Sequence, residues 1–248
     1  LKIQKEMVSA MKAVHFNSTT IEALMEALYE LNKKLNPYKN QSTANKLSVI
    51  EARGRLHVGI IAPQGKSRTL LNNPSASLLQ NISTIREKSE VKDEDLDPYW
   101  TLVLYYNSLR ELGGGQSSLR KNIPQMIRLF ANHSGSKPRE LYSEKELTSR
   151  KTGEELSIAK EHLEFDLSSG KNVVDVVSTS NMFQVGIDIG RLGLMSIVGQ
   201  PRSNSEYIQS SGRVGRKHPG MVLSLLKGGD AASSFPFTYI LSLESPDA

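Results

Sequence analysis

The chain has 248 residues, of which 38 % are hydrophobic and 23 % are charged, with 18 Gly and 10 Pro. This composition excludes collagen, a coiled coil and wholesale disorder, and the length suits one large domain or two small ones. Basic residues number 31 against 26 acidic residues, and the net charge of +5 leans mildly toward polyanionic partners. Because the chain has no Cys, disulfides, thiolate metal sites and a Cys nucleophile are excluded.

The sequence contains no targeting signal for a membrane. Its apolar runs fall far short of the roughly 18 residues that a transmembrane helix needs, and its start lacks the pattern of a signal peptide. We therefore predict a cytoplasmic protein without a membrane partner. The first residue is Leu rather than Met, which favours a piece of a longer polypeptide.

The first part of the chain, residues 1–97, is predicted to be a helical and irregular connector. Apolar residues recur at helical spacing in two stretches, 3–14 and 21–35. Beyond Pro37 this pattern fades, which leaves one expected strand over 56–61 and an acidic, solvated linker at its end. We place the domain boundary at Asp97–Pro98.

The second part, residues 98–248, alternates short apolar runs with amphipathic stretches, which is typical of βαβ units around a parallel sheet. Strands are predicted over 100–106, 140–147, 173–178, 194–198 and 221–226. Helices that cover both faces of the sheet are predicted over 119–130, 153–167 and 205–212. Gly113–Gly115 is interpreted as a flexible connection. This part is therefore expected to be an α/β domain.

The polar residues that follow the third of these strands indicate phosphate chemistry. Ser178 and Thr179 end the strand, at the edge where open α/β sheets bind ligands, and hydroxyl groups there can bind phosphate oxygens. A tight turn at 186–188 is expected to bring the carboxylate of Asp188 to the same edge. The alternative is that Asp188 only caps a turn.

Two arginines three residues apart end the last predicted helix. Arg213 and Arg216 are therefore expected to project from nearly one helical face. Gly212 and Gly215 keep the backbone uncrowded, and two planar cations beside small residues suit bidentate binding of a polyphosphate. The alternative left open is that both arginines only complement the helix macrodipole.

These residues resemble the motifs of superfamily 2 helicases and translocases. Motif V, T-x-x-x-x-x-x-G-x-D, is matched by Thr179, Gly186 and Asp188. Motif VI, Q-x-x-G-R-x-G-R, is matched by Gln209, Gly212, Arg213, Gly215 and Arg216. Residues 105–110 resemble motif IV, and residues 146–150 resemble the segment of these proteins that contacts nucleic acid. Over residues 97–226 the sequence is most similar to the helicase component of DISARM-type antiphage systems.

The resemblance implies a RecA-like parallel sheet flanked by helices, the second lobe of a P-loop NTPase-like motor. It implies that Arg213 and Arg216 are arginine fingers. They would act on ATP and Mg²⁺, which bind only together with a first lobe. The residues that it assigns to ATP binding are Gln209, Gly186, Asp188, Gly212 and Gly215. Those that it assigns to nucleic acid, with DNA favoured over RNA, are Thr179, Ser178, Asn107, Ser108, Thr148, Ser149 and Arg150.

A superfamily 2 motor also needs a Walker A loop and an acidic D-E-x-H-type box, and neither occurs here. Residues 63–67, Pro-Gln-Gly-Lys-Ser, fail the G-x-x-x-x-G-K-S spacing because Gly59 stands one residue too early. The five histidines are scattered, so no metal site is expected. We therefore expect an ATP-dependent helicase whose first lobe lies outside this chain, and an isolated chain without activity. The alternative is a RecA-like module that binds nucleic acid or protein and hydrolyses nothing.

Overall fold

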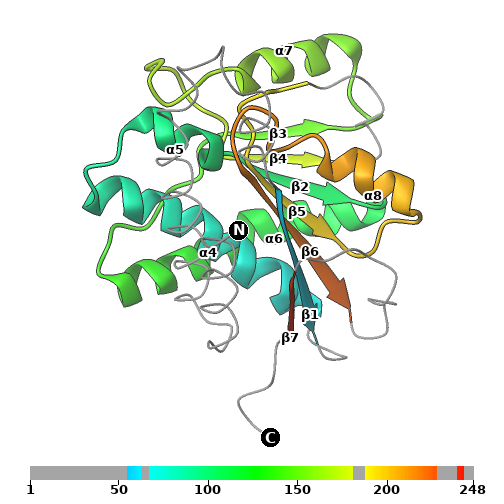
Figure 1. Cartoon of the computed structure of the whole chain (residues 1–248), viewed down its shortest axis with the longest axis horizontal. Helices are drawn as coiled ribbons and strands as arrows, with labels where there is room; N and C mark the ends of the chain where they lie inside the picture. Colours follow the sequence, from blue (N-terminus) through cyan, green and yellow to red (C-terminus); the bar gives the residue numbers. More distant parts are fainter. Residues whose placement is uncertain (1–54, 63–66, 181–187, 228–238, 243–248) are drawn as a thin grey trace, which may run out of the picture.

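The computed structural model describes residues 55–62, 67–180, 188–227 and 239–242. These residues form a seven-stranded sheet with the strand order β3-β4-β2-β5-β6-β1-β7, in which every described pair of strands is parallel (Figure 1). The strands are β1 (Arg55–Ala62), β2 (Leu102–Tyr106), β3 (Glu144–Leu147), β4 (Val176–Thr179), β5 (Leu194–Val198), β6 (Gly220–Lys227) and β7 (Tyr239–Ser242). The helices are α4 (Ser67–Lys88), α5 (Asp93–Trp100), α6 (Leu109–Ser134), α7 (Gly153–Leu163) and α8 (Asn204–Ser211).

The central strand β2 shows why the sheet is covered on both faces. All of its residues are buried, and they alternate between two hydrophobic clusters. Leu104 belongs to the cluster that α4, α5 and α6 complete, whereas Val103 belongs to the cluster that α7 and α8 complete. The predicted α/β fold with a parallel, RecA-like sheet is therefore confirmed.

The predicted strands agree with the observed ones within a few residues, except the strand expected over 140–147. Only Glu144–Leu147 pairs with β4, because the carboxylate of Asp175 accepts the backbone N–H groups of Tyr142 (2.8 Å) and Ser143 (3.0 Å). These two amides are therefore bound to a side chain rather than to a neighbouring strand.

The interpretation of Gly113–Gly115 as a flexible connection is wrong, because this run lies inside α6. Ser108 caps the helix by accepting the N–H of Glu111 at 3.2 Å. Gly115 is buried against Tyr106, and a Cβ atom at this position would collide with the phenol ring. The glycine therefore permits a close approach of α6 to β2.

The described part of residues 1–97 is more regular than predicted. It contains β1 and the helices α4 and α5, and β1 lies inside the sheet between β6 and β7. The acidic stretch is the first turn of α5 rather than a linker, with Arg86 paired to Asp93 at 2.6 Å. The boundary predicted at Asp97–Pro98 falls inside α5. The division at this point stays a prediction, but β1 shares one sheet with the rest of the chain, and α4 and α5 share its hydrophobic core.

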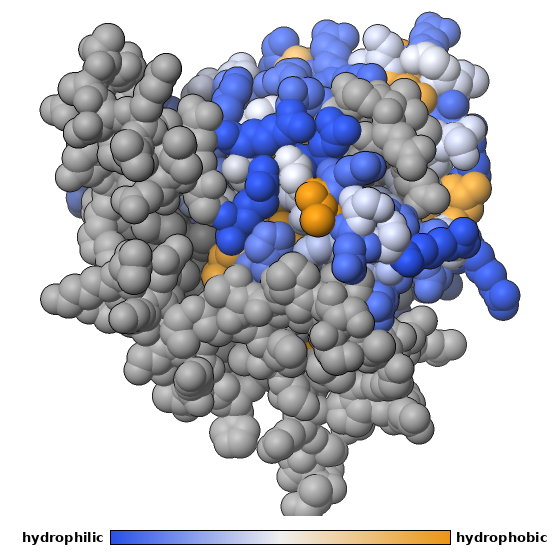
Figure 2. Space-filling model, turned by 45° about the vertical axis from the view of Figure 1, so that its right-hand side comes forward, coloured by the Kyte–Doolittle hydropathy of each residue, from blue (hydrophilic) through white to orange (hydrophobic). Residues whose placement is uncertain are grey.

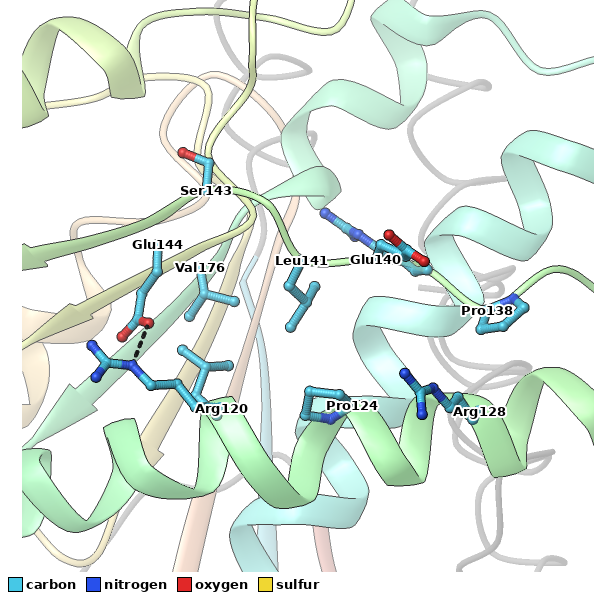
Figure 3. Close-up of a pocket in the computed structure, with 11 residues that line it drawn as sticks. Arg120, Pro124, Arg128, Pro138, Glu140, Leu141, Ser143, Glu144 and Val176 are labelled. Carbon is cyan, nitrogen blue, oxygen red and sulfur yellow. Dashed lines mark ion pairs between the residues drawn. The ribbon is translucent and has the colours of Figure 1, made fainter.

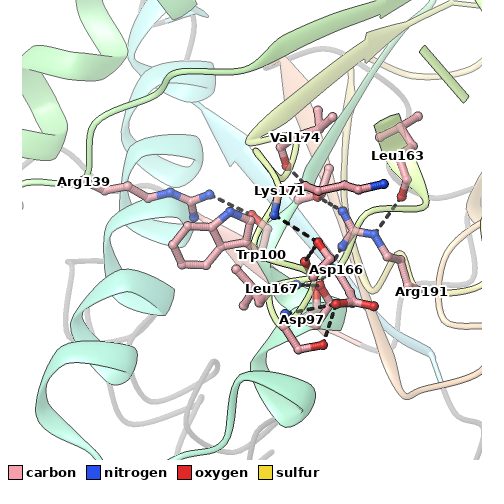
Figure 4. A network of polar contacts seen from close by, with 12 residues as sticks. Asp97, Trp100, Arg139, Leu163, Asp166, Leu167, Lys171, Val174 and Arg191 are labelled. Carbon is pink, nitrogen blue, oxygen red and sulfur yellow. Dashed lines mark hydrogen bonds and ion pairs between the residues drawn. The ribbon is translucent and has the colours of Figure 1, made fainter. Parts of the chain in front are cut away.

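Two buried ion pairs fasten the amino ends of β2 and β4 (Figure 4). Arg139 pairs with Asp175 at 2.7 Å, and Arg191 pairs with Asp97 at 3.2 Å. Figure 4 shows Trp100 between the two arginines, and the guanidinium carbon of Arg139 lies 3.8 Å from its ring centroid. Within the described part of the chain, no helix is long and apolar enough to cross a membrane.

Candidate functional site

The predicted site residues fall into two groups at opposite edges of the sheet. Thr179 stands level with Leu147 and Tyr105, at the carboxyl ends of their strands. Gly215 instead donates its backbone N–H to Leu192, which precedes the amino end of β5, at 2.8 Å. Asp188 pairs with Arg216 in this second group. The expectation that Asp188 shares an edge with Thr179 is therefore wrong.

We call residues 212–216 the arginine loop. Helix α8 ends at Ser211, so both arginines of the loop lie beyond the helix. The prediction that they project from one helical face is therefore wrong. The loop is held from inside by Val214, which is fully buried in the core. Gly215 has a positive φ of 68°, a conformation that side chains other than glycine rarely adopt. A Cβ atom there would also lie 3.0 Å from the Gly220 backbone, so the glycine is required twice over.

The side chains around the arginine loop carry more positive than negative charge. Arg216 donates from Nε to Gly212 O at 3.2 Å and forms an ion pair with the exposed carboxylate of Asp188. Arg55, at the start of β1, donates from Nε to Val214 O at 2.6 Å and from Nη2 to Gly212 O at 3.2 Å. Burial, followed by repulsion from Arg216, lowers the pKa of Arg55. The guanidinium groups of Arg213 and Arg216 can bind a polyphosphate, while that of Arg55 is bound to the loop carbonyls.

Arg55 is the residue of this group that the sequence does not reveal. It precedes the arginine loop by 157 residues or more and lies in no recognisable motif. Of the remaining residues predicted to bind the nucleotide, Gln209 is exposed on α8, and Gly186 lies outside the described residues.

At the carboxyl edge, Glu146 accepts hydrogen bonds from two of the residues predicted to contact nucleic acid, Thr148 and Arg150. Its carboxylate accepts from Arg150 Nε (3.0 Å) and Nη2 (2.9 Å), from Gln116 (2.8 Å) and from the Thr148 hydroxyl. Burial opposes the charge of Glu146, but these hydrogen bonds outweigh it and lower its pKa. Arg150 and Ser149 are exposed, so a strand can reach them, with the charge of Arg150 partly compensated.

A second part of the carboxyl edge joins β2 to β5. Asn107 donates to Val198 O (3.2 Å) and to Gln200 O (2.9 Å), so it ties the ends of the two strands together. An open hollow of about 610 Å³ lies above them, lined by Asn107, Ser108, Arg110, Glu111, Gln200 and Arg202. The sequence analysis missed Arg110 and Arg202, which are both exposed. Figure 2, turned to bring this side forward, shows mostly hydrophilic side chains with isolated hydrophobic ones.

Ser178 and Thr179 are fully buried at the end of β4. The Thr179 hydroxyl donates to Leu147 O at 2.9 Å and approaches Ser180 O at 3.1 Å, so it links β4 to the end of β3. The Ser178 hydroxyl has no hydrogen-bond partner among the described residues. Contact of these two residues with nucleic acid stays a prediction.

A further hollow, of about 410 Å³, lies between α6 and the segment 138–144 (Figure 3). Its lining includes Leu141 and Val176, and Arg120 approaches Glu144 at 3.7 Å in it. Burial raises the pKa of Glu144. None of the predicted site residues lines this hollow, and it belongs to neither group of the candidate site.

Comparison with known proteins agrees with the motifs. The family described as helicase conserved C-terminal domain matches residues 138–218. The DISARM protein DrmA of Bacillus paralicheniformis is 42 % identical over 172 residues. The match covers 69 % of this chain and 15 % of that protein, so the chain spans about a seventh of the length of this curated relative.

Two solved structures are similar in fold. Domain 2 of the DEAD-box helicase Mss116p, bound to an RNA duplex, has a TM-score of 0.48 and 12 % identity, over 77 % of this chain and 66 % of that chain. The DUF1998 helicase MrfA, bound to DNA, has a TM-score of 0.42 and 17 % identity, over 65 % of this chain and 17 % of that chain. On the family match and the sequence relative, residues 138–218 carry a helicase conserved C-terminal domain of the superfamily 2 type, and the chain is related to the DISARM protein DrmA.

Proposed function

We propose that this chain is the second RecA-like lobe of an ATP-dependent nucleic-acid helicase or translocase, and that it works as part of a longer protein with a first lobe. The observation that carries the proposal is the arginine loop. Arg213 and Arg216 lie on a loop that is held by the buried Val214 and by Gly215, and Asp188 is the exposed counter-charge of Arg216. We propose that both guanidinium groups stabilise the charge that develops on the transferring phosphoryl group of ATP.

The charges of this edge suit the phosphates of ATP better than its magnesium ion. Arg213 and Arg216 lie in the arginine loop, Arg55 contacts the loop, and the carboxylate of Asp188 pairs with Arg216. Among the residues that the structure describes, no group of His, Asp or Glu is placed to hold a metal ion. We therefore propose that the first lobe supplies the ligands of Mg²⁺ and the Walker lysine. Gln209, Gly212 and Gly215 complete the proposed nucleotide contacts, together with Gly186.

We propose that the carboxyl edge contacts the sugar-phosphate backbone of a strand. Exposed or half-buried polar and basic residues follow the ends of β3, β2 and β5 there: Ser149, Arg150, Asn107, Ser108, Arg110 and Arg202. Such contacts position a strand without reading its bases. The relationship to a DISARM protein favours DNA as the strand, and a cytoplasmic role in defence against phage.

Phosphate release tests the proposal. The chain alone, with or without nucleic acid, is expected to release no phosphate above background. The full-length protein is expected to be an ATPase that nucleic acid stimulates. Turnover by the repurified chain, lost on substitution Lys66→Ala, would contradict the assignment of the phosphate-binding loop to another lobe. A full-length protein without ATPase activity would contradict the motor.

The second candidate function is a RecA-like module that binds nucleic acid or a protein without hydrolysis. The observation that favours it is the failure of residues 63–67 to satisfy the Walker A spacing, while the polar carboxyl edge is present. A first lobe with Walker motifs in the same reading frame would decide for the motor. If no such lobe exists, the binding module is the better description.

A further inference from the structure

Arg55 is the residue through which β1 reaches the arginine loop. β1 and β6 run parallel with Arg55 opposite Gly220, four residues beyond Arg216 in the chain. This register places the Arg55 side chain across the loop. Its two hydrogen bonds reach Val214 O at 2.6 Å and Gly212 O at 3.2 Å.

These two carbonyl groups are the ones that flank Arg213. The Gly212 carbonyl belongs to the peptide unit between Gly212 and Arg213, and the Val214 carbonyl belongs to the unit between Val214 and Gly215. The Arg55 guanidinium therefore holds the peptide unit that enters Arg213 and the one that leaves Val214. Gly212 O also accepts from Arg216 Nε at 3.2 Å. Arg55 and Arg216 therefore share one acceptor, and a displacement of Arg55 is transmitted to both arginines of the loop.

Packing adds to this hold. A Cβ atom at Gly215 would lie 3.2 Å from Arg55 Cγ, so the aliphatic stem of Arg55 is in close contact with the glycine of positive φ. The arginine loop is thereby held on several sides: by the buried Val214, by the bond from Gly215 N to Leu192 O and by Arg55.

We infer that Arg55 is a positioning residue, which sets the orientation of Arg213 and Arg216 for phosphoryl transfer without contacting the nucleotide. This inference rests on the proposed function. Burial, followed by repulsion from Arg216, lowers the pKa of Arg55, so a cation at this position carries an electrostatic cost. The planar fork of an arginine compensates for that cost, because it donates to two carbonyl groups at once, whereas a lysine ammonium has no such fixed geometry.

The test uses the full-length protein with the substitutions Arg55→Met and Arg55→Lys, and Arg128→Met as the matched control. Arg128 is an exposed arginine on α6 that lines the hollow of Figure 3, and no residue of the arginine loop lines this hollow. Both Arg55 variants are expected to lower kcat of the nucleic-acid-stimulated ATPase by about 10²-fold, the order expected for a misplacement of about 1 Å. KM for ATP is expected to stay within about 2-fold, because ground-state contacts from the first lobe remain. The control is expected to match the wild type.

A double-mutant cycle separates positioning from a structural role. In the background Arg216→Ala, the substitution Arg55→Met is expected to lower kcat much less than in the wild type, because residues that act as a unit are non-additive. Full additivity, or an Arg55→Lys variant with normal kcat, would overturn the inference. If Arg216→Ala itself leaves the ATPase intact, the proposed function fails instead.

Hydrogen exchange of the same proteins provides a readout that needs no ATPase. The amides of residues 212–216 are expected to exchange faster in Arg55→Met than in the wild type and in Arg128→Met, while those of β2 keep their protection. Unchanged exchange in the arginine loop would overturn the inference whether or not the protein hydrolyses ATP.

Discussion

Two pairs of arginines lie at the amino edge of one sheet and differ in almost every physical respect. Arg139 and Arg191 are buried between elements, and each is paired with a buried carboxylate. Arg213 and Arg216 stand half-buried on a loop, and Arg216 is paired with an exposed carboxylate, that of Asp188. The exposed fractions are 2 % and 6 % for the side chains of Arg139 and Asp175, but 33 % and 63 % for Arg216 and Asp188.

The two buried arginines, Arg139 and Arg191, donate hydrogen bonds to groups inside the protein. Arg191 donates to Leu163 O (2.7 Å), to the Thr101 hydroxyl (2.7 Å) and to Asp97. Arg139 donates to Leu79 O, to Trp100 O and to Asp175, across elements that are distant in the sequence. Such arginines join helices to strands, and their guanidinium groups are buried away from any ligand in solution.

The loop pair shows the opposite arrangement. Its arginines share their surroundings with a third cation, Arg55, and with the carboxylate of Asp188, so the positive charge is in excess. A group of cations that is held in place by the backbone and partly exposed is suited to an anionic ligand. The comparison teaches that the surroundings of an arginine, more than its burial alone, separate a structural role from a functional one.

The largest expected effect is on catalysis by the loop pair. In the full-length protein, Arg216→Ala is expected to lower the nucleic-acid-stimulated ATPase by about 10³ to 10⁵-fold, because an arginine that stabilises the transition state contributes this much in related enzymes. Arg213→Ala is expected to act to a similar degree. Phosphate release at saturating ATP and nucleic acid measures the effect. The free energy of unfolding is expected to change by less than about 1 kcal/mol, since a partly exposed ion pair contributes little.

The conservative substitution sharpens this result. Arg216→Lys is expected to restore little activity, because an ammonium keeps the charge but loses the planar fork. A lysine variant with normal turnover and normal stability would show that the loop pair is structural, and the contrast between the two pairs would disappear.

The next largest effect is on stability, and it belongs to the buried pair. Arg139→Met is expected to lower the free energy of unfolding by about 3 to 5 kcal/mol, because it leaves the buried carboxylate of Asp175 without its partner. Urea unfolding followed by circular dichroism measures this loss. The double substitution Arg139→Met with Asp175→Asn is expected to be less destabilising than the single one, because it removes the unpaired charge while an amide oxygen can still accept from Tyr142 and Ser143. A single variant as stable as the wild type would contradict the assignment.

The sheet could be predicted from the sequence to a large extent because its strands are continuous apolar runs. The strand predicted over 194–198 is the observed β5, and the predicted runs around β2, β4 and β6 end within a few residues of the observed ends. The prediction failed where side chains from elsewhere decide the backbone. Asp175 binds two amides that would otherwise extend β3, and Gly115 in α6 leaves room for the ring of Tyr106.

The site could be predicted only as far as motifs are local. The spacing of Gln209, Gly212, Arg213, Gly215 and Arg216 identifies the arginine loop without any structure. The partner that holds this loop, Arg55, comes from a parallel strand 157 or more residues earlier, and no local pattern reveals such a pairing. Arg110 and Arg202 were missed for the same reason, since only the sheet brings them to one hollow.

A smaller effect is expected on strand binding at the carboxyl edge. Arg150 differs from both pairs of arginines, because its own side chain is exposed whereas its carboxylate partner, Glu146 at 2.9 Å, is largely buried. Arg150→Ala and Arg202→Ala are each expected to reduce the slope of log affinity against log salt by about 0.7 for single-stranded oligonucleotides. Fluorescence anisotropy at several salt concentrations measures this slope.

The loss is expected to be about equal for unrelated sequences, because phosphate contacts carry no base information. Arg128→Ala serves as the control for the loss of one exposed cation at a distance from this edge. Strong preference for one sequence, or an unchanged slope in both variants, would place the strand elsewhere.

The smallest expected effect concerns His57, which follows Arg55 by two residues in β1 and joins the arginine group to α8. Its Nδ1 lies 2.8 Å from the Tyr207 hydroxyl, and burial, followed by repulsion from Arg55, lowers its pKa below the usual value of about 6.5. Above that value the folded and unfolded states are both neutral at this residue, so it contributes no pH dependence. As the pH falls below about 6.5, the unfolded state takes up a proton that the folded state does not bind, and the free energy of unfolding decreases.

Urea unfolding between pH 5 and pH 7.5 should therefore show a steeper decrease of the free energy of unfolding for the wild type than for His57→Gln. Arg55→Met should also reduce the decrease, because it removes the cation that disfavours protonation of His57. Parallel curves for the wild type and both variants would mean that His57 is not coupled to the cations of the arginine loop, and that their excess charge is screened within a few ångströms of the loop itself.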